Sequence, residues 1–277
     1  MCQECGCGLP GEKPAGISAH HHDHGHSHGH DHHHDHAHPH SHTHSHGDVT
    51  GQHRVLEVRQ AILEKNERLA ERNRGFFHAR GLLVLNVLSS PGSGKTTFIR
   101  ETIRSLGKRL KTGVIVGDLA TDNDAERLRK SGAPVVQITT GTVCHLEAEM
   151  VANALKQLDL KGLDLLIIEN VGNLVCPASY DLGEDLRVVL LSVTEGEDKP
   201  LKYPPMFQSA GAEVISKLDL ATACDYNREA ALANLHRLAP NSPVFELSAK
   251  TGQGMDAWCK FLIQQHKAIK ARGPLGV

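Results

Sequence analysis

The sequence lacks any run of apolar residues that approaches the length of about 20 needed to cross a membrane. It also lacks a block rich in lysine and arginine, since 30 basic residues stand against 32 acidic ones for a formal net charge of −2. The electrostatic footprint of a nucleic-acid-binding protein is therefore missing. Residues 1–16 do not have the charged-then-apolar layout of a secretory signal. We expect a cytosolic protein without a nucleic-acid partner and without membrane insertion.

Large apolar side chains are scarce at the beginning of the chain, where residues 1–50 contain little beyond Leu9, Ile17 and Val49. Such a segment cannot bury a core, and we expect it to stay disordered without metal. Residues 51–277 suffice for one large α/β domain, whereas a second globular domain is not expected.

Histidine is concentrated in one tract, because sixteen of the 21 histidines lie within residues 20–46. Many imidazoles without fixed geometry, with pKa values near 6.5, bind divalent metal at neutral pH and lose it as acidity rises. The tract is long and interrupted by Asp, Gly and Ser, unlike the uniform short run of an affinity tag. We interpret it as a storage or buffering element formed by His20, His21, His22, His24, His26, His28, His30, His32, His33, His34, His36, His38, His40, His42, His44 and His46.

Three of the seven cysteines, Cys2, Cys5 and Cys7, form the pattern CxxCxC. In a reducing compartment this clustering favours metal ligation over disulfides. The three thiolates, with the α-amino group as a candidate fourth ligand, suit square-planar Ni(II). Tetrahedral Zn(II) is also chemically acceptable, so the spacing alone leaves the metal open.

Beyond residue 50, strand-like apolar runs alternate with helical patterns. The runs are LLVLNVLSS, GVIVGD, APVVQIT, DLLIIEN, LRVVLLSV, AEVISKLD and SPVFELSA. This alternation predicts an α/β fold with a mostly parallel sheet flanked by helices, in which ligands bind beyond the carboxyl ends of the strands. An amphipathic helix is predicted over 53–74 and ends at Gly75. Further helices are predicted to begin near Gly94, Asp124, Cys144, Tyr226 and Met255.

The segment SSPGSGKTT follows the strand predicted over 82–88 and opens a helix, as a Walker A phosphate loop requires. Backbone N–H groups and the helix N-terminus would bind phosphate oxygens. Lys95 would reach the β- and γ-phosphates, and Thr96 would offer a hydroxyl to Mg²⁺. Ser89 stands where GxxxxGK[ST] has its first glycine, so the match is incomplete. The predicted nucleotide contacts of the loop are Pro91, Gly92, Ser93, Gly94, Lys95, Thr96 and Thr97.

Acidic residues follow two of the predicted strands. Glu169 ends LLIIE, and the element Glu-Asn-Val-Gly has the layout of DxxG, in which the N–H of Gly172 would approach the γ-phosphate. After the second strand, one of the carboxylates of Asp118, Asp122 and Asp124 can orient the attacking water or complete the Mg²⁺ coordination. Asp124 has a competing interpretation as a helix cap. The predicted catalytic residues are Lys95, Asp118, Asp124 and Glu169, and the predicted Mg²⁺ ligands are Thr96, Asp118 and Glu169.

Two elements late in the chain predict recognition of guanine. In SKLD, Asp219 would accept from the guanine N1–H and 2-amino groups, and the Lys217 stem would lie along the base. Ser216 replaces the asparagine of NKxD, so GTP is favoured without being fixed. The SAK element, formed by Ser248, Ala249 and Lys250, would support the guanine carbonyl. In this order, at strand ends, the elements predict a P-loop GTPase domain over 51–277.

Two cysteines of the domain are candidate metal ligands. Cys144 and His145 are predicted to open the helix after the third strand, and Cys176 follows four residues after Gly172. A metal site there would change geometry between GTP and GDP states. On spacing alone, ordinary packing of buried cysteines is the stronger alternative. Cys224 and Cys259 are interpreted as structural.

Together, CQECGCG, the histidine tract, SSPGSGKTT, GDLATDNDA, GTVCHLEA, ENVGNLVCP, SKLDL and SAKTGQGMDAW resemble the HypB family of hydrogenase nickel-incorporation GTPases. The resemblance covers nearly the whole chain. It implies a GTP-dependent homodimer that delivers Ni(II) to the large subunit of [NiFe]-hydrogenase with a zinc-containing HypA-type accessory protein. It also implies a high-affinity nickel site at Cys2, Cys5 and Cys7, and a weaker nickel or zinc site at the dimer interface, formed by Cys144, His145 and Cys176.

Two alternatives remain open. The urease nickel GTPases are similar in loop and fold and can carry a histidine-rich head, although CxxCxC and the Cys-His-Leu element favour HypB. A passive nickel or zinc store would bind nucleotide without useful hydrolysis. Lys95, Thr96, Asp118 and Glu169 argue against this second alternative, and only turnover can decide it.

Overall fold

The computed structural model describes residues 49–119 and 122–272. Its centre is one seven-stranded sheet in the order β3-β2-β4-β1-β5-β6-β7, and every neighbouring pair is parallel. The strands are β1 Leu83–Ser89, β2 Thr112–Asp118, β3 Val135–Thr139, β4 Leu165–Glu169, β5 Leu186–Ser192, β6 Ala212–Ser216 and β7 Val244–Glu246. Each predicted apolar run forms one of these strands, which confirms the parallel α/β fold.

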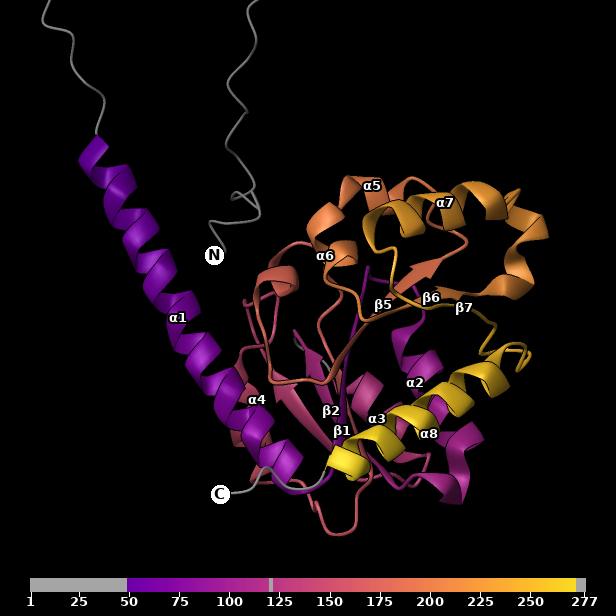
Figure 1. Cartoon of the computed structure of the whole chain (residues 1–277), viewed down its shortest axis with the longest axis horizontal. Helices are drawn as coiled ribbons and strands as arrows, with labels where there is room; N and C mark the ends of the chain where they lie inside the picture. The colour runs from indigo at the N-terminus through magenta and orange to yellow at the C-terminus, as the bar shows by residue number, and fades with distance from the viewer. Residues whose placement is uncertain (1–48, 120–121, 273–277) are drawn as a thin grey trace, which may run out of the picture.

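Helices cover both faces of the sheet (Figure 1). They are α1 Val49–Ala79, α2 Lys95–Leu106, α3 Asn123–Arg129, α4 Ala148–Leu155, α5 Lys199–Lys202, α6 Pro204–Gln208, α7 Arg228–Leu238 and α8 Met255–Arg272, with 3-10 turns at Gly107–Arg109, Cys176–Ser179, Leu218–Leu220 and Thr222–Cys224. Leu85 of β1 belongs to the cluster that also contains Phe98 and Trp258, whereas Val84 belongs to the cluster with Phe77. Because both faces are covered, the strands are almost continuously apolar.

Helix α1 is longer than the sequence predicts, because it continues past Gly75 to Ala79. Phe77, which is fully buried, extends the apolar face of the helix beyond the glycine. The helix ends instead at Ala79, and Gly81, whose φ of 64° is left-handed, closes the turn after it by donating its N–H to the carbonyl of His78. The N-terminal half of α1 projects away from the sheet in Figure 1, and Val58 on that half is 60% exposed.

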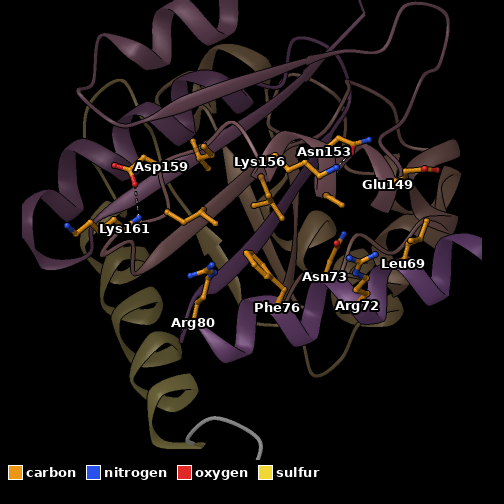
Figure 2. A pocket seen from close by; sticks show the side chains of 14 residues that line it. Leu69, Arg72, Asn73, Phe76, Arg80, Glu149, Asn153, Lys156, Asp159 and Lys161 are labelled. Atoms are coloured by element: carbon orange, nitrogen blue, oxygen red, sulfur yellow. Dashed lines mark hydrogen bonds between the residues drawn. The ribbon is translucent and has the colours of Figure 1, made fainter. Parts of the chain in front are cut away.

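A cavity of about 810 Å³ lies between α1 and α4 (Figure 2). Leu69 and Phe76 of α1 line it together with Leu158, and Arg80 lies over the Phe76 ring at 4.4 Å. Since β1 begins at Leu83, directly after α1, this cavity lies away from the carboxyl ends of the strands.

The helix predicted to begin near Asp124 is confirmed, whereas the competing role of Asp124 as its cap and the helix start at Cys144 are wrong. Helix α3 begins at Asn123 with Asp122 in the N-cap position, so Asp124 lies in the first turn and is not the cap. Asp122 pairs with Arg129 at 2.6 Å on the surface. Helix α4 begins at Ala148 and not at Cys144, since the residues between them form a loop. Within 49–119 and 122–272, we find no helix with both the length and the apolar character of a membrane span.

Glu213 is a carboxyl group buried on β6, the strand beside the edge strand β7. Its side chain is 1% exposed, and neither carboxylate oxygen has a hydrogen-bond partner among the described residues. Burial raises its pKa from 4.5 to about 8. Because the folded state binds this proton more tightly than the unfolded state, stability is greatest below the unfolded pKa and falls as pH rises through the folded pKa.

We therefore expect Glu213→Gln to flatten the pH dependence of unfolding. As pH rises from about 5 to about 9, the urea midpoint of the wild-type chain should decrease. The corresponding loss in its free energy of unfolding is on the order of a few kcal/mol. The variant should lose less, and part of the loss should remain because burial also raises the pKa of Glu169, to about 7. Glu126→Gln, at an exposed position, is the control, and its urea midpoint should depend on pH as in the wild type. The same pH dependence in Glu213→Gln would contradict the raised pKa of Glu213.

Candidate functional site

The phosphate loop joins β1 to α2. Gly92 and Gly94 have φ values of 78° and 95°, in the region that favours glycine. Gly94 occupies the N-cap position of α2, so the first N–H groups of the helix face the loop. A Cβ at Gly172, after β4, would lie 3.1 Å from Pro91 Cα, which explains a glycine at this close approach. Both segments line a cavity of about 390 Å³, in which phosphate groups can meet backbone N–H groups.

Thr96 and Glu169 form the part of this cavity best suited to a divalent cation. The Thr96 hydroxyl donates to Glu169 Oε1 at 2.7 Å, and Glu169 Oε2 is buried without a hydrogen-bond partner. Burial raises the pKa of Glu169 to about 7, while the Thr96 hydroxyl and the Lys95 ammonium oppose that shift. A hydroxyl beside a carboxyl group with an unsatisfied oxygen matches the oxygen preference of Mg²⁺. These residues therefore fit the ion.

Lys95 points back into the loop. Its Nζ donates to Ser89 Oγ at 3.1 Å. Burial lowers the pKa of Lys95, and the carboxylates of Glu169 and Asp124 act in the opposite direction. Ser89, which replaces the first glycine of the motif, is not among the residues with positive φ, so the backbone there does not require glycine. Its hydroxyl instead contacts Lys95, which the sequence predicts to be catalytic.

Asp118 and Asp124 line the same cavity, from the end of β2 and the first turn of α3. Asp118 Oδ1 accepts from the backbone N–H of Leu119 at 2.6 Å. Asp124 Oδ1 lies 3.3 Å from Arg127 Nη1, and Arg127 also lines the cavity. The sequence motifs do not single out Arg127. Its spacing of three residues from Asp124 on a helix is the signal that puts both side chains on one face.

A second cavity, of about 230 Å³, adjoins the phosphate loop and is lined by the SKLD and SAK elements. Lys217 has a left-handed φ of 58°, and its Nζ donates to the carbonyl of Gly92 at 2.6 Å. Asp219 Oδ1 accepts from the Ser248 hydroxyl at 2.6 Å, and Asp219 Oδ2 lies 3.9 Å from Lys250 Nζ. The two elements, about 30 residues apart in the sequence, thus lie around one cavity.

Ser93 links the phosphate loop to the base side of the site. The Ser216 hydroxyl donates to the Ser93 carbonyl at 2.9 Å, so the residue that replaces asparagine still bonds to the loop. The Ser93 hydroxyl donates to Glu195 Oε2 at 3.0 Å, which also accepts from the N–H of Ser192 at 2.9 Å. Glu195 is missed by sequence reasoning because it lies 102 residues from Ser93 and belongs to no local motif.

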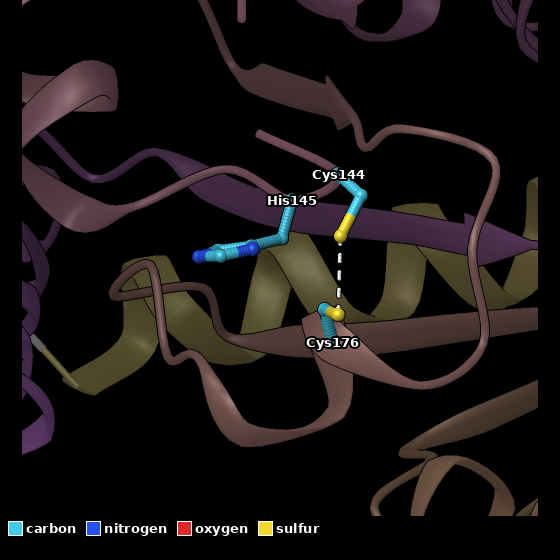
Figure 3. A group of neighbouring side chains, drawn as sticks. All are labelled: Cys144, His145 and Cys176. Carbon is cyan, nitrogen blue, oxygen red and sulfur yellow. Dashed lines mark hydrogen bonds between the residues drawn. The ribbon is translucent and has the colours of Figure 1, made fainter. Parts of the chain in front are cut away.

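Cys144, His145 and Cys176 lie together (Figure 3), on the segments that follow β3 and β4. One ligand atom from each residue lies within 4.8 Å of the other two, and the two Sγ atoms are 3.1 Å apart. His145 is 5% exposed and Cys176 is 4% exposed. Thiolates with an imidazole are suitable ligands for nickel or zinc. The juxtaposition favours metal binding over simple cysteine packing.

The loop before α4 carries Cys144 and His145 to this place. Leu146 packs over β2 at Gly117, where a Cβ would lie 2.8 Å from Leu146 Cδ2. The ring of His145 stacks on Tyr180, with centroids 3.9 Å apart and planes at 29°. The absence of a side chain at Gly117 therefore lets the loop cross β2 and reach the segment after β4.

The other predicted metal ligands, Cys2, Cys5, Cys7 and the tract within 20–46, lie outside the described residues. What the described residues define is a P-loop NTPase-type nucleotide-binding protein. Its two cavities, one at the phosphate loop and one lined by the SKLD and SAK elements, lie at the carboxyl ends of the strands, and the candidate metal cluster lies on the segments after β3 and β4.

Comparison with known proteins narrows this class. The family model for the CobW/HypB/UreG nucleotide-binding domain matches residues 83–246. Hydrogenase maturation factor HypB of Azotobacter chroococcum mcd 1 is 50% identical over 224 residues, which cover 80% of this chain and 73% of that protein. Hydrogenase/urease maturation factor HypB of Helicobacter pylori is 44% identical over 216 residues, covering 76% and 88%. The crystal structure of Helicobacter pylori HypB in complex with nickel superposes with a TM-score of 0.70 at 43% identity, covering 74% of this chain and 96% of that one. The chain belongs to the HypB family of hydrogenase maturation factors.

Proposed function

We propose that this chain is a GTP-hydrolysing nickel metallochaperone that holds Ni(II) in residues 1–50 and delivers it to the large subunit of [NiFe]-hydrogenase. One observation carries the proposal. A single short segment runs from Glu169 at the nucleotide cavity, past Gly172 against the phosphate loop, to Cys176 in the metal cluster. The name of the relatives as maturation factors, and the nickel complex of the Helicobacter pylori protein, support it.

The nucleotide is proposed to be GTP. The Asp219 carboxylate, held by the Ser248 hydroxyl, can accept from both the N1–H and the 2-amino group of guanine, a pair of donors that adenine does not present. Lys217 bonds to the Gly92 carbonyl and so keeps its stem along the floor of the base cavity.

Hydrolysis would use the groups around the phosphate cavity. The N–H groups of the loop and the Lys95 ammonium would bind the phosphates, and Asp118 or Asp124 would orient the attacking water. Thr96 and Glu169 would hold Mg²⁺, which when bound neutralises charge on the phosphate oxygens. Arg127 lines this cavity but pairs with Asp124, so it is not assigned as an arginine finger and intrinsic turnover should be slow.

The metal cluster would change with the nucleotide. We propose that GTP favours a homodimer in which Cys144, His145 and Cys176 of two subunits surround nickel, and that hydrolysis weakens this site and releases the metal. A HypA-type accessory protein and the hydrogenase large-subunit precursor would receive it. Zn(II) is a competing ion for the same thiolates.

The cluster makes a direct prediction in the full-length chain. With Cys2, Cys5 and Cys7 changed to Ser, thiolate-to-nickel charge-transfer absorption should report Cys144 and Cys176, because the histidines give no such band. In that background, Cys144→Ser should weaken the nickel affinity measured from this band by at least about 10-fold, since the site loses a thiolate ligand. Cys224→Ser, at an exposed position outside the cluster, is the control; equal titrations of the two variants would contradict the site.

Two experiments test the function as a whole. The same titration with GDP and with a non-hydrolysable GTP analogue should give different nickel affinities, and identical values would remove the support for coupling between the nucleotide and the metal site.

Deletion of the gene, with hydrogenase and urease assays with and without added nickel, tests which enzyme receives the metal. Loss of hydrogenase alone fits the proposal, loss of urease alone favours the urease-type alternative, and retention of both favours a passive store.

A further inference from the structure

Asn170 is a buried residue that follows Glu169 directly and is 1% exposed. Its backbone N–H bonds to the Val87 carbonyl of β1 at 3.1 Å. Its Oδ1 accepts from two backbone N–H groups, that of Val171 at 2.9 Å and that of Leu146 at 3.2 Å. Backbone N–H groups are donors only, so these two contacts fix which amide atom is oxygen.

The Leu146 contact is the first link to the metal cluster. Leu146 directly follows His145, so the Asn170 side chain holds the loop that carries two of the three candidate ligands. A neighbouring contact acts on the same loop, because the Asn173 amide donates to the Cys144 carbonyl at 3.4 Å. The residue that follows Glu169 thus positions a segment 24 residues away in the sequence.

A second link runs through the sheet. The Asn170 amide donates to Asn86 Oδ1 at 3.2 Å, and the Asn86 amide donates to Glu184 Oε1 at 3.1 Å. Glu184 also accepts from Arg187 Nε at 2.8 Å. The other two guanidinium nitrogens of Arg187 donate to the carbonyls of Ala178 and Tyr180, at 2.9 and 2.7 Å.

This second link ends at the other side of the metal cluster. Ala178 lies in the 3-10 turn that begins at Cys176, and the Tyr180 ring stacks on His145. Figure 3 shows the three candidate ligands drawn together from these two segments. The two branches from Asn170 therefore hold both of the segments whose relative position sets the geometry of the cluster.

We propose that Asn170 is the positioning residue through which the nucleotide state at Glu169 and Gly172 sets the geometry of Cys144, His145 and Cys176. The proposal rests on the proposed function, since it specifies how the metal site is regulated. Gly172 meets the phosphate loop at close range, so a displacement of this segment on γ-phosphate loss displaces Asn170. A buried hydrogen-bonding group that loses its partner costs about 1–3 kcal/mol, which makes Leu146 follow Asn170.

Asn170→Asp separates the two branches. The carboxylate keeps both backbone N–H contacts but has no amide to donate to Asn86. If Asn86 turns to donate to it, the oxygen of Asn86 then faces the Glu184 carboxylate, so the second branch is broken in either orientation. The matched control is Asn66→Asp, because Asn66 is also buried and accepts from the Ala148 N–H, and its amide donates to the Asp181 carbonyl and not to a residue of β1 or β4.

The measurement is nickel affinity of the full chain in the background with Cys2, Cys5 and Cys7 changed to Ser, read from thiolate-to-nickel absorption with GDP and with the GTP analogue. Coupling between sites is typically about 5- to 150-fold. We expect the nickel affinities with the GTP analogue and with GDP to differ by a ratio of that size in the background chain and in Asn66→Asp. In Asn170→Asp this ratio should lie within about 2-fold of one.

A second variant guards against misfolding. Asn86→Leu breaks the second branch from its other end and keeps both backbone N–H contacts of Asn170 Oδ1, at a cost of about 1–3 kcal/mol for the Asn170 amide that loses its acceptor. It should bind nickel with one affinity in both nucleotide states. A background-like ratio in either folded variant would overturn the role of Asn170 and leave the proposed function intact. Equal affinities in the background chain itself would overturn the coupling and this inference together, while nickel binding and GTP hydrolysis would still be tested separately.

Discussion

Lys95→Ala should reduce the rate of GTP hydrolysis at saturating nucleotide by at least about 100- to 1000-fold, the usual effect of removing one preorganised group that stabilises developing charge. Lys95 Nζ lies within the loop at 3.1 Å from Ser89 Oγ, where phosphate oxygens are expected. Its removal also leaves the buried Glu169 carboxyl group without a cation that lowers its pKa. The steady-state rate of phosphate release at saturating GTP is the measurement.

The control for this prediction is Lys108→Ala, which removes a lysine from an exposed position just after α2. It should retain wild-type turnover. Nickel binding by residues 1–50 should be the same in both variants, because Lys95 belongs to the nucleotide cavity. A wild-type rate of GTP hydrolysis in Lys95→Ala would contradict the assignment of the phosphate loop.

Asp219→Asn should weaken GTP binding by at least about 1000-fold and shift preference toward xanthosine triphosphate. A carboxylate offers two acceptors to the two donors of guanine, whereas an asparagine amide presents one donor to the guanine 2-amino group and leaves it unpaired. Xanthine has a carbonyl in that place, so the amide matches it. Sites built on such hydrogen bonds reject a mismatched ligand by about four to five orders of magnitude.

Binding of both nucleotides, measured by competition with a fluorescent GDP, tests this exchange. Asp225→Asn is a matched control, since Asp225 is exposed and has a left-handed φ of 49°, which asparagine also tolerates. It should bind GTP as the wild type does. If Asp219→Asn keeps its preference for GTP, then the SKLD element does not read the base, and the cavity lined by Lys217 and Ala249 has another occupant.

Local patterns predict much of the fold and of the nucleotide site. The seven apolar runs become seven strands because a parallel sheet covered on both faces buries most residues of its five inner strands and part of each residue in the edge strands β3 and β7. The phosphate loop is predicted for a similar reason. Gly92, Gly94 and Lys95 lie close together in the chain, and their geometry depends on a few backbone angles and one helix N-terminus.

Helix boundaries in the same sequence are less well predicted. Gly75 is a residue type that often ends a helix, yet Phe76 and Phe77 extend the apolar face of α1. Packing of Phe77 against the core outweighs the loss of helix stability that one glycine causes. Likewise, Cys144 does not begin α4, because the preceding loop must first cross β2 over Gly117. Both errors arise where tertiary contacts compete with local preference.

By itself, the sequence determined the α/β class, the phosphate loop, the order of the base-recognition elements and the residue types suited to metal. Only the tertiary structure brought Cys144 within 3.1 Å of Cys176, Ser93 to Glu195, and Asn170 to Leu146. The physical reason is the strand order. Because β2 lies between β3 and β4, and β4 lies beside β1, loops distant in the chain emerge at one edge of the sheet. Spacing in the sequence carries no record of that adjacency.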